Sequence, residues 1–191
     1  MIVTRVSKSR SKSIRQGDIY RNIECLEYIR EEKGILEISK ISYPYVMVLS
    51  QACDLRYDYQ NRKDIEINPG KTQDKHLISA LVVPLFNAGQ FIRGEHLSEL
   101  KLRMRSDMGW DSTEGKKVMN NQLPRFHYLK FPNEVNIVDS VLDFKHFFTI
   151  SIEVLYRVRR KNFVCTVSPL FREEISDRFA FYVARIGLPE S

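Results

Sequence analysis

The sequence predicts a mainly β protein of the α+β class with a helix at its C-terminus. Short segments rich in β-branched and aromatic residues recur between residues 19 and 150, separated by polar or turn-forming residues. A clear helical pattern of apolar residues follows near the C-terminus. The chain has 191 residues, 43% of them hydrophobic, so it is long enough to close one core. We therefore expect a single domain over residues 16–191, preceded by an arm.

Residues 1–15 are basic and contain no acid. The segment mixes serines with cationic side chains, which are Arg5, Lys8, Arg10, Lys12 and Arg15. This composition predicts a flexible arm that is either simply solvated or bound to nucleic acid. The whole chain has 30 Lys and Arg against 24 Asp and Glu, a net charge of +6 and a pI near 9.2. The excess favours an anionic partner, with RNA or DNA as the first candidate.

The first strands are predicted from two kinds of pattern. Residues 19–29 and 35–39 are rich in strand-forming residues on either side of a turn at Gly34, which indicates a hairpin. Residues 45–49 are nearly all apolar, as is typical of a central strand buried on both faces. Residues 77–85 are also largely apolar and predict the neighbouring strand.

The middle of the chain is less regular. Residues 56–75 are polar and predict a long loop, interrupted by a short strand at residues 65–67. A mixed insertion is predicted over residues 91–135, where the apolar periodicity is poor. The other expected elements are a short helix at 96–101, strands at 125–131, 137–141 and 147–150, and a helical turn at 152–158.

The final helix is predicted over residues 169–186. Ser168 is suited to cap its N-terminus, and Pro169 is suited to its first position. Apolar residues then recur at helical spacing, and Gly187 stops the pattern.

The sequence also favours a cytoplasmic protein that contacts no membrane. It contains no apolar run long enough for a signal peptide or for a membrane span. Its three cysteines, Cys25, Cys53 and Cys165, are odd in number and far apart, which predicts free thiols in a reducing compartment. No motif for a metal or a cofactor is present, although Cys53, Asp54, His76 and His96 could supply scattered ligands. We therefore expect neither group.

Cys53, Asp54 and Arg56 are the candidate catalytic residues, because they follow directly on the predicted central strand. A thiol becomes a nucleophile when a cation or a base lowers its pKa, and Arg56 is a nearby cation. Gln51 is a candidate for binding nucleic acid at the same place. The alternative is that Cys53 fills the core and Asp54 caps a turn.

Four more residues are candidates for binding nucleic acid: Arg125, His127, Arg159 and Arg160. Residues 125–130 interleave basic and aromatic side chains, which can contact phosphates and stack on bases. Those aromatic side chains could equally fill a core. Arg159 and Arg160 belong to a basic run that is either a solvated turn or part of a phosphate-binding face.

Three short stretches resemble the PemK/MazF-like toxins. They are Gly17-Asp18-Ile19-Tyr20, Tyr43-Pro44-Tyr45-Val46-Met47-Val48-Leu49-Ser50 and Leu81-Val82-Val83-Pro84-Leu85, and the resemblance covers roughly residues 16–90. It implies an SH3-like β-barrel, here with a mixed insertion and a C-terminal helix. It also implies metal-independent RNA cleavage in a bacterial toxin-antitoxin or defence system. An antitoxin or an operon subunit is then a candidate partner, and a homodimer is a further option.

The chain departs from the family at two positions. Tyr43 stands where the family has its catalytic Arg, and Phe86 stands where it has a Thr. Tyrosine carries no cation to stabilise the charge that develops on phosphorus. Two functions stay open. The first is a protein that binds or cleaves nucleic acid, with its chemistry moved to Ser50 through Arg56. The second is a non-catalytic interaction subunit that kept the barrel.

Overall fold

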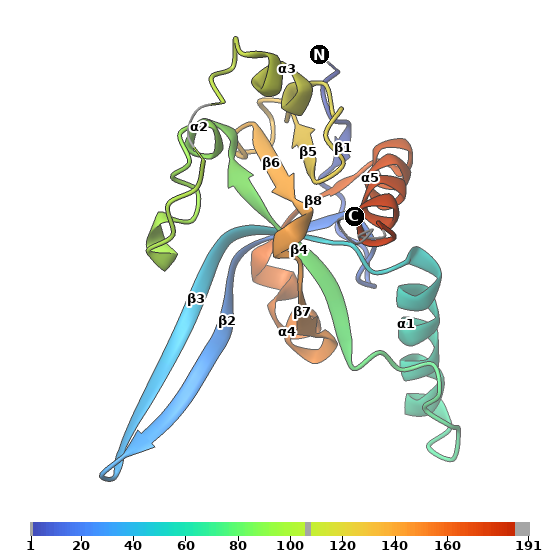
Figure 1. Cartoon of the computed structure of the whole chain (residues 1–191). Coiled ribbons are helices and arrows are strands. Elements are labelled where there is room, and N and C mark those ends of the chain that lie inside the picture. Colours follow the sequence, from blue (N-terminus) through green and yellow to red (C-terminus); the bar gives the residue numbers. More distant parts are fainter. Residues whose placement is uncertain (1, 106–107, 186–191) are drawn as a thin grey trace, which may run out of the picture. The chain divides into compact units, whose positions relative to one another are not determined.

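A computed structural model of the chain describes residues 2–105 and 108–185 (Figure 1). The chain divides into two units. The first, which we call the hairpin unit, comprises Lys8–Pro84 and Phe148–Thr166. The second, the histidine unit, comprises Met1–Ser7, Leu85–Phe147 and Val167–Ser191. The predicted α+β class is confirmed, whereas the single domain over residues 16–191 stays a prediction.

The hairpin unit contains an antiparallel sheet. Its strands are β2 (Asp18–Glu32), β3 (Ile35–Val48), β4 (Ser79–Asn87), β7 (Phe148–Ser151) and β8 (Phe163–Val167). The pairings place them in the order β8, β2, β3, β4, β7. The predictions of a hairpin, of a central strand and of its neighbour are therefore confirmed. β4 continues past Pro84 into the histidine unit.

β2 and β3 form a long hairpin that extends from its unit (Figure 1). Its turn is made by Lys33 and Gly34, whose φ angles of 52° and 77° are both positive. Two consecutive left-handed residues match the right-handed twist of the flanking strands, and glycine adopts this conformation without strain.

The loop predicted for residues 56–75 is wrong over residues 56–67, and the short strand at residues 65–67 is wrong as well. Helix α1 spans Ala52–Ile67. Its buried residues are Leu55, Asp58 and Asn61, at helical spacing, so two of the three are polar. A helix that buries polar groups has no apolar stripe, and the usual periodicity signal is therefore missing.

The core of the hairpin unit lies between its sheet and α4, which spans Ile152–Asn162. Ile152 and Leu155 of α4 pack with Tyr20 and Val46 of the sheet and with Leu55 of α1. The predicted helical turn at residues 152–158 is thus a full helix. Ile14 joins the same core at 1% exposure, so the end of the predicted arm contacts the fold.

The histidine unit combines strands with short helices. Its strands are β1 (Val6–Ser7), β5 (Phe126–Leu129), β6 (Ser140–Asp143) and the end of β4. β6 pairs antiparallel with both β4 and β5. Its helices are α2 (Ala88–Ile92), α3 (Thr113–Met119), α5 (Pro169–Val183) and the 3-10 turns η1 (Ser98–Leu100) and η2 (Phe144–His146).

The C-terminal helix is confirmed as α5, with Pro169 at its start. The role predicted for Ser168 is wrong in one respect. Ser168 occupies the N-cap position, yet its side chain makes no capping hydrogen bond. Arg178 anchors α5 instead, because its Nη2 donates to the carbonyls of Leu123 and Phe126 at 2.7 and 2.8 Å. Residue 186, the predicted end of the helix, lies outside the described residues.

Candidate functional site

The predicted catalytic residues lie at the start of α1, in the hairpin unit. Cys53, Asp54 and Arg56 are all exposed on the first turns of this helix, and Gln51 precedes it. The alternative that Cys53 fills the core is therefore wrong. The Cys53 thiol lies 3.5 Å from Oε1 of Gln51 and 3.6 Å from Oδ1 of Asp54. Both neighbours are oxygen acceptors, and neither is a cation.

Arg56 turns toward Tyr57, with its guanidinium 5.3 Å from the ring centroid. The cation that was expected to activate Cys53 is thus placed over an aromatic ring. The loop before α1 has a structural role, because the Ser50 hydroxyl accepts a 2.7 Å hydrogen bond from the backbone N–H of Leu81. This bond ties the end of β3 to β4.

Arg159 and Arg160 lie in the last turn of α4. The Arg159 side chain donates a hydrogen bond to the carbonyl of Ser11, and the Arg160 carbonyl accepts one from Arg10 at 3.0 Å. Cations near a helix C-terminus also interact favourably with the helix dipole. These contacts give Arg159 a structural role as well as a charge.

Arg125 has a different environment, in the histidine unit. Its Nε and Nη2 donate to the two carboxylate oxygens of Asp143 at 2.7 and 2.5 Å. Asp143 is fully buried at the end of β6, where it also accepts a hydrogen bond from the backbone N–H of Lys145 at 3.0 Å. Arg125 directly precedes β5, and its neighbour Phe126 is paired with Asp143 across the two strands. The strand register therefore brings the two charges together.

Two histidines adjoin this ion pair. Nε2 of His146 lies 3.4 Å from Oδ2 of Asp143. The His96 ring packs on Phe86 and Phe91, with centroids 4.9 and 4.8 Å apart, and neither of its nitrogens has a partner among the described residues. Phe86 also contacts the His146 ring at 6.1 Å. One aromatic side chain thus joins the two imidazoles.

Burial keeps both imidazoles neutral near pH 7. Loss of hydration lowers the pKa of His96 to about 4, although the Asp143 carboxylate opposes the shift. The pKa of His146 is also lowered by burial, and Asp143 again acts in the opposite direction. A neutral imidazole is a proton acceptor, so the pair can take part in general acid-base chemistry.

The backbone around His96 is shaped by local sequence. Asn87 caps α2, because its side chain accepts from the backbone N–H of Gly89 and Gln90. Gly94 then ends this turn with a φ of 69°, and a Cβ there would lie 2.4 Å from the carbonyl oxygen of Met104. Only glycine permits both the left-handed backbone and this close approach. The segment that carries His96 is therefore held against the chain near Met104.

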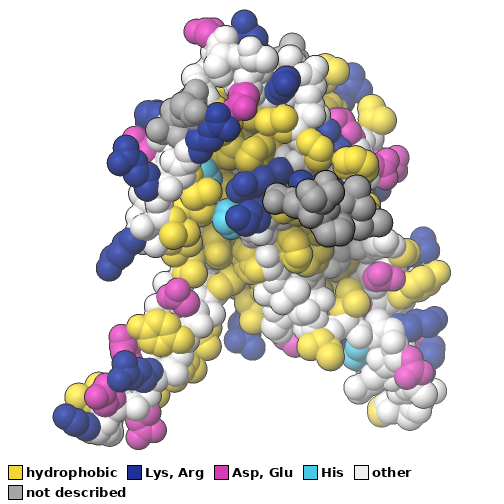
Figure 2. Space-filling model, in the orientation of Figure 1, with side chains coloured by type: hydrophobic (Ala, Val, Ile, Leu, Met, Phe, Trp, Pro, Cys, Tyr) yellow, Lys and Arg dark blue, Asp and Glu magenta, His cyan; other side chains and the backbone are white. Residues whose placement is uncertain are grey.

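Three groups of this site line a cavity in the same unit. His96, Arg125 and Asp143 contribute to its wall, together with Glu114, and its volume is about 210 Å³. His146 reaches the cluster beside Asp143, and its side chain is 27% exposed. Figure 2 shows histidine side chains next to Lys and Arg side chains in the middle of the visible face. We call His96, Arg125, Asp143 and His146 the histidine cluster.

His127 is not part of the histidine cluster. It is 1% exposed and lines a second cavity of the same unit, described below. Sequence reasoning selected Arg125 and His127 because both lie in one basic and aromatic segment. It missed Asp143 and His146 and named His96 only as a scattered metal ligand, because residues 96, 125 and 143 are too far apart to form a motif.

Comparison of the chain with protein-family models, curated proteins and solved structures gives no match. The resemblance to PemK/MazF-like toxins therefore stays a prediction. Across residues 2–105 and 108–185, no helix has the length and hydrophobicity needed to cross a membrane. Within the same ranges, His, Cys, Asp and Glu side chains form no group of three or more with the geometry to hold a metal ion.

Proposed function

We propose that this protein binds RNA and cleaves it without a metal ion, and that the histidine cluster carries the chemistry. The observation that supports this most is that His96 and the Arg125–Asp143 pair line one cavity, with the His146 imidazole beside Asp143. Cleavage of RNA by its own 2′-hydroxyl needs a base, an acid and a cation, and these are the groups that the cluster contains. The net charge of +6 favours the polyanionic substrate.

The groups have defined roles in this reaction. His96 accepts the proton of the 2′-hydroxyl as the new O2′–P bond forms. Arg125 stabilises the negative charge that develops on the phosphoryl oxygens. Its bonds to Asp143 use Nε and Nη2, so in this proposal Nη1 is the nitrogen that donates to the phosphoryl group. In mildly acid solution, where His146 is protonated, it gives its proton to the 5′-oxygen as the P–O5′ bond breaks. The products are a 2′,3′-cyclic phosphate and a 5′-hydroxyl.

The family resemblance supports the same function by a separate route. The three stretches that resemble the PemK/MazF-like toxins lie on β2, β3 and β4. These strands are consecutive neighbours in the antiparallel sheet of the hairpin unit. Consecutive antiparallel strands are what an SH3-like barrel requires. In this proposal the reaction belongs to the histidine unit. Tyr43 lies in the hairpin unit, and Phe86 contributes only by packing against the rings of His96 and His146.

The chemical groups at the ends of the RNA cleavage products test the proposal. Purified protein is incubated in EDTA with an RNA oligonucleotide and with DNA of the same sequence. We expect cleavage of the RNA alone, with 2′,3′-cyclic phosphate and 5′-hydroxyl ends. Equal cleavage of the DNA would contradict the proposal, because DNA lacks the attacking hydroxyl.

A second candidate function, the interaction subunit, is favoured by the β2–β3 hairpin. Ile29 pairs with Ile38, and both share one face with Leu26 and Leu36; the four side chains are 50 to 58% exposed. Residues 24–40 carry five acidic and three basic side chains in a chain of net charge +6. An acidic, partly apolar hairpin suits the basic surface of a second copy. A dimer that Ile29→Lys converts to monomer in sedimentation would support the pairing of two copies through this hairpin, and a monomeric wild type would exclude that pairing.

A further inference from the structure

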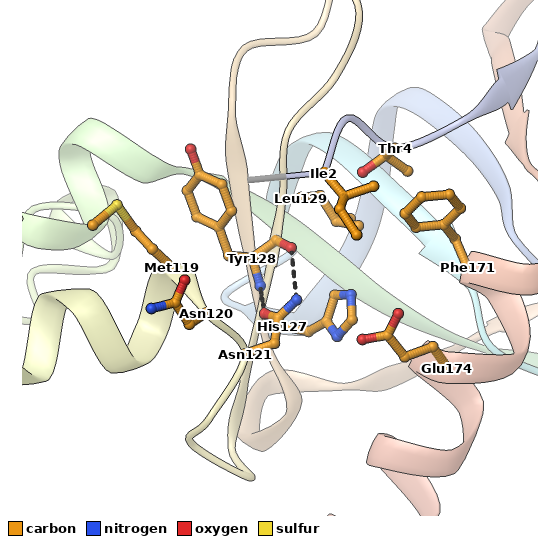
Figure 3. Close-up of a pocket in the computed structure, with 10 residues that line it drawn as sticks. All are labelled: Ile2, Thr4, Met119, Asn120, Asn121, His127, Tyr128, Leu129, Phe171 and Glu174. Carbon is orange, nitrogen blue, oxygen red and sulfur yellow. Dashed lines mark hydrogen bonds between the residues drawn. The ribbon is translucent and has the colours of Figure 1, made fainter.

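His127 lines a cavity of about 260 Å³ between β5, α3 and α5 of the histidine unit (Figure 3). The His127 side chain is 1% exposed, and its Nδ1 has no hydrogen-bond partner among the described residues. A buried polar atom without a partner lowers stability, and few native groups are left in this state. The unpaired nitrogen therefore points to a ligand that completes its hydrogen bonding.

The surroundings of His127 define the polar side of the cavity. Figure 3 shows its ring between the side chain of Asn121 and the carboxylate of Glu174. Asn121 is held in place, because its Oδ1 accepts from the backbone N–H of Tyr128 at 2.6 Å and its Nδ2 donates to the carbonyl of Tyr128 at 3.3 Å. Glu174, on α5, supplies an acceptor, and Asn120 supplies an amide group.

The opposite side of the cavity is apolar. Phe171 of α5 and Ile2 face the space in Figure 3, and Met119 and Leu129 complete this part of the wall. Aromatic and aliphatic side chains of this kind pack against the face of a flat ring. The cavity is smaller than the roughly 300 Å³ at which pockets for drug-sized molecules begin, so it suits one ring system.

Electrostatics favour an uncharged ligand. Burial lowers the pKa of His127 to about 3, with the Arg178 cation adding to the shift, so the imidazole is neutral and has one donor and one acceptor. The Glu174 carboxylate disfavours an anion in the same space. A neutral flat ring with N–H donors and ring acceptors on its edge satisfies both groups, and carboxylates accept hydrogen bonds from the amino groups of bases.

We propose that this cavity receives one nucleobase of the RNA, an inference that rests on the proposed function. His127 stands opposite Leu142, and Phe126 stands opposite Asp143. Successive strand residues point to opposite faces, so the two cavities lie on the two faces of the β5–β6 pair. The base is stacked on Phe171 and hydrogen-bonded by His127 and Glu174, while a different nucleotide of the same RNA occupies the histidine cluster.

Uncharged nucleosides separate this inference from the proposed cleavage, because they carry no phosphate. The full chain is titrated with cytidine, adenosine, guanosine and uridine, and binding is followed by NMR. We expect saturable binding of at least one nucleoside with an amino group, and about tenfold weaker binding in Glu174→Gln. The matched control is Glu173→Gln, on the same helix but outside the cavity, which should bind as the wild type does.

His127→Leu should abolish the same binding. Because His127 is buried, this variant could fail to fold, and Glu174→Gln then provides the test. His96→Gln should still bind nucleoside although it no longer cleaves RNA. Failure of folded wild-type protein to bind any of the four nucleosides would overturn the base pocket and leave the cleavage assay unaffected. Binding that is unchanged in Glu174→Gln would overturn it as well, because the nucleoside would then occupy another place.

Discussion

Arg125 and Asp143 form a bidentate ion pair, in which the carboxylate is fully buried and the arginine side chain is 30% exposed. Asp143 fixes the orientation of the guanidinium and compensates its charge in a partly dehydrated site. The same carboxylate lies beside His146. One buried residue thus positions both the cation and an imidazole of the histidine cluster.

Asp143→Asn should therefore destabilise the protein strongly. The variant leaves the Arg125 guanidinium half-buried without an anion, and loss of one partner of a buried pair costs about 3 kcal/mol when the other partner is partly exposed. Urea unfolding should show a lower midpoint with an unchanged slope. Asp64→Asn is the matched control, because Asp64 pairs with Lys71 at 2.6 Å on the surface, where a pair contributes less than about 1 kcal/mol. Equal losses in the two variants would contradict the role of Asp143.

The rate of RNA cleavage should be greatest in mildly acid solution. His96 is a base only above its pKa of about 4, and His146 is an acid only below its own pKa, which is lowered from the ordinary value of 6.5. The profile of kcat/KM against pH should thus rise above pH 4 and fall before pH 6.5. A rate that keeps rising up to pH 8 would be incompatible with His146 as the acid.

Two serines at helix N-termini should respond differently to alanine. Ser168→Ala should change the free energy of unfolding by less than about 0.5 kcal/mol, since the side chain makes no capping bond. Ser112→Ala should cost about 1 kcal/mol, because the Ser112 hydroxyl accepts a 3.0 Å bond from the backbone N–H of Gly115 at the start of α3. Thermal or urea unfolding of both variants checks the difference, and a larger loss at Ser168 would show that it caps α5.

Cys53→Ser decides between the two candidate sites. The Cys53 side chain is exposed, so the variant should keep its stability within about 0.5 kcal/mol. It should also cleave RNA at the wild-type rate, because the histidine cluster lies in the other unit. A stable but inactive Cys53→Ser protein would instead place the chemistry at the start of α1.

The sequence predicted the elements whose burial is apolar. β3 and β4 bury continuous apolar runs at residues 46–48 and 82–86, and α5 buries Ile175 between the half-buried Phe171 and Phe179, so these patterns are readable without tertiary contacts. Helix α1 was not predicted because it buries the polar residue Asp58. The Asp58 carboxylate accepts hydrogen bonds from the Arg62 side chain, from the Leu77 backbone N–H and from the Tyr156 hydroxyl. A buried polar network has no periodic signature in one sequence.

The candidate site was predictable only in part for a related reason. Arg125 stood out within a segment of basic and aromatic residues, and it does belong to the histidine cluster. His96 and Asp143 reach it through the β5–β6 register and through the turn at Gly94, which sequence spacing does not reveal. Cys53 stood out for its chemistry, but its thiol lies beside acceptor oxygens of Gln51 and Asp54, and the Arg56 guanidinium lies over the Tyr57 ring.

The most direct test of the account is the rate of RNA cleavage in EDTA by two histidine variants. His96→Gln removes the proposed base, and general base catalysis contributes about 10² to 10⁴ in rate. His76→Gln is the same substitution in the hairpin unit, outside the histidine cluster. We predict at least a hundredfold loss in His96→Gln and the wild-type rate in His76→Gln, with both variants folded. Cleavage by His96→Gln at the wild-type rate, or no cleavage by the wild type, would contradict the account.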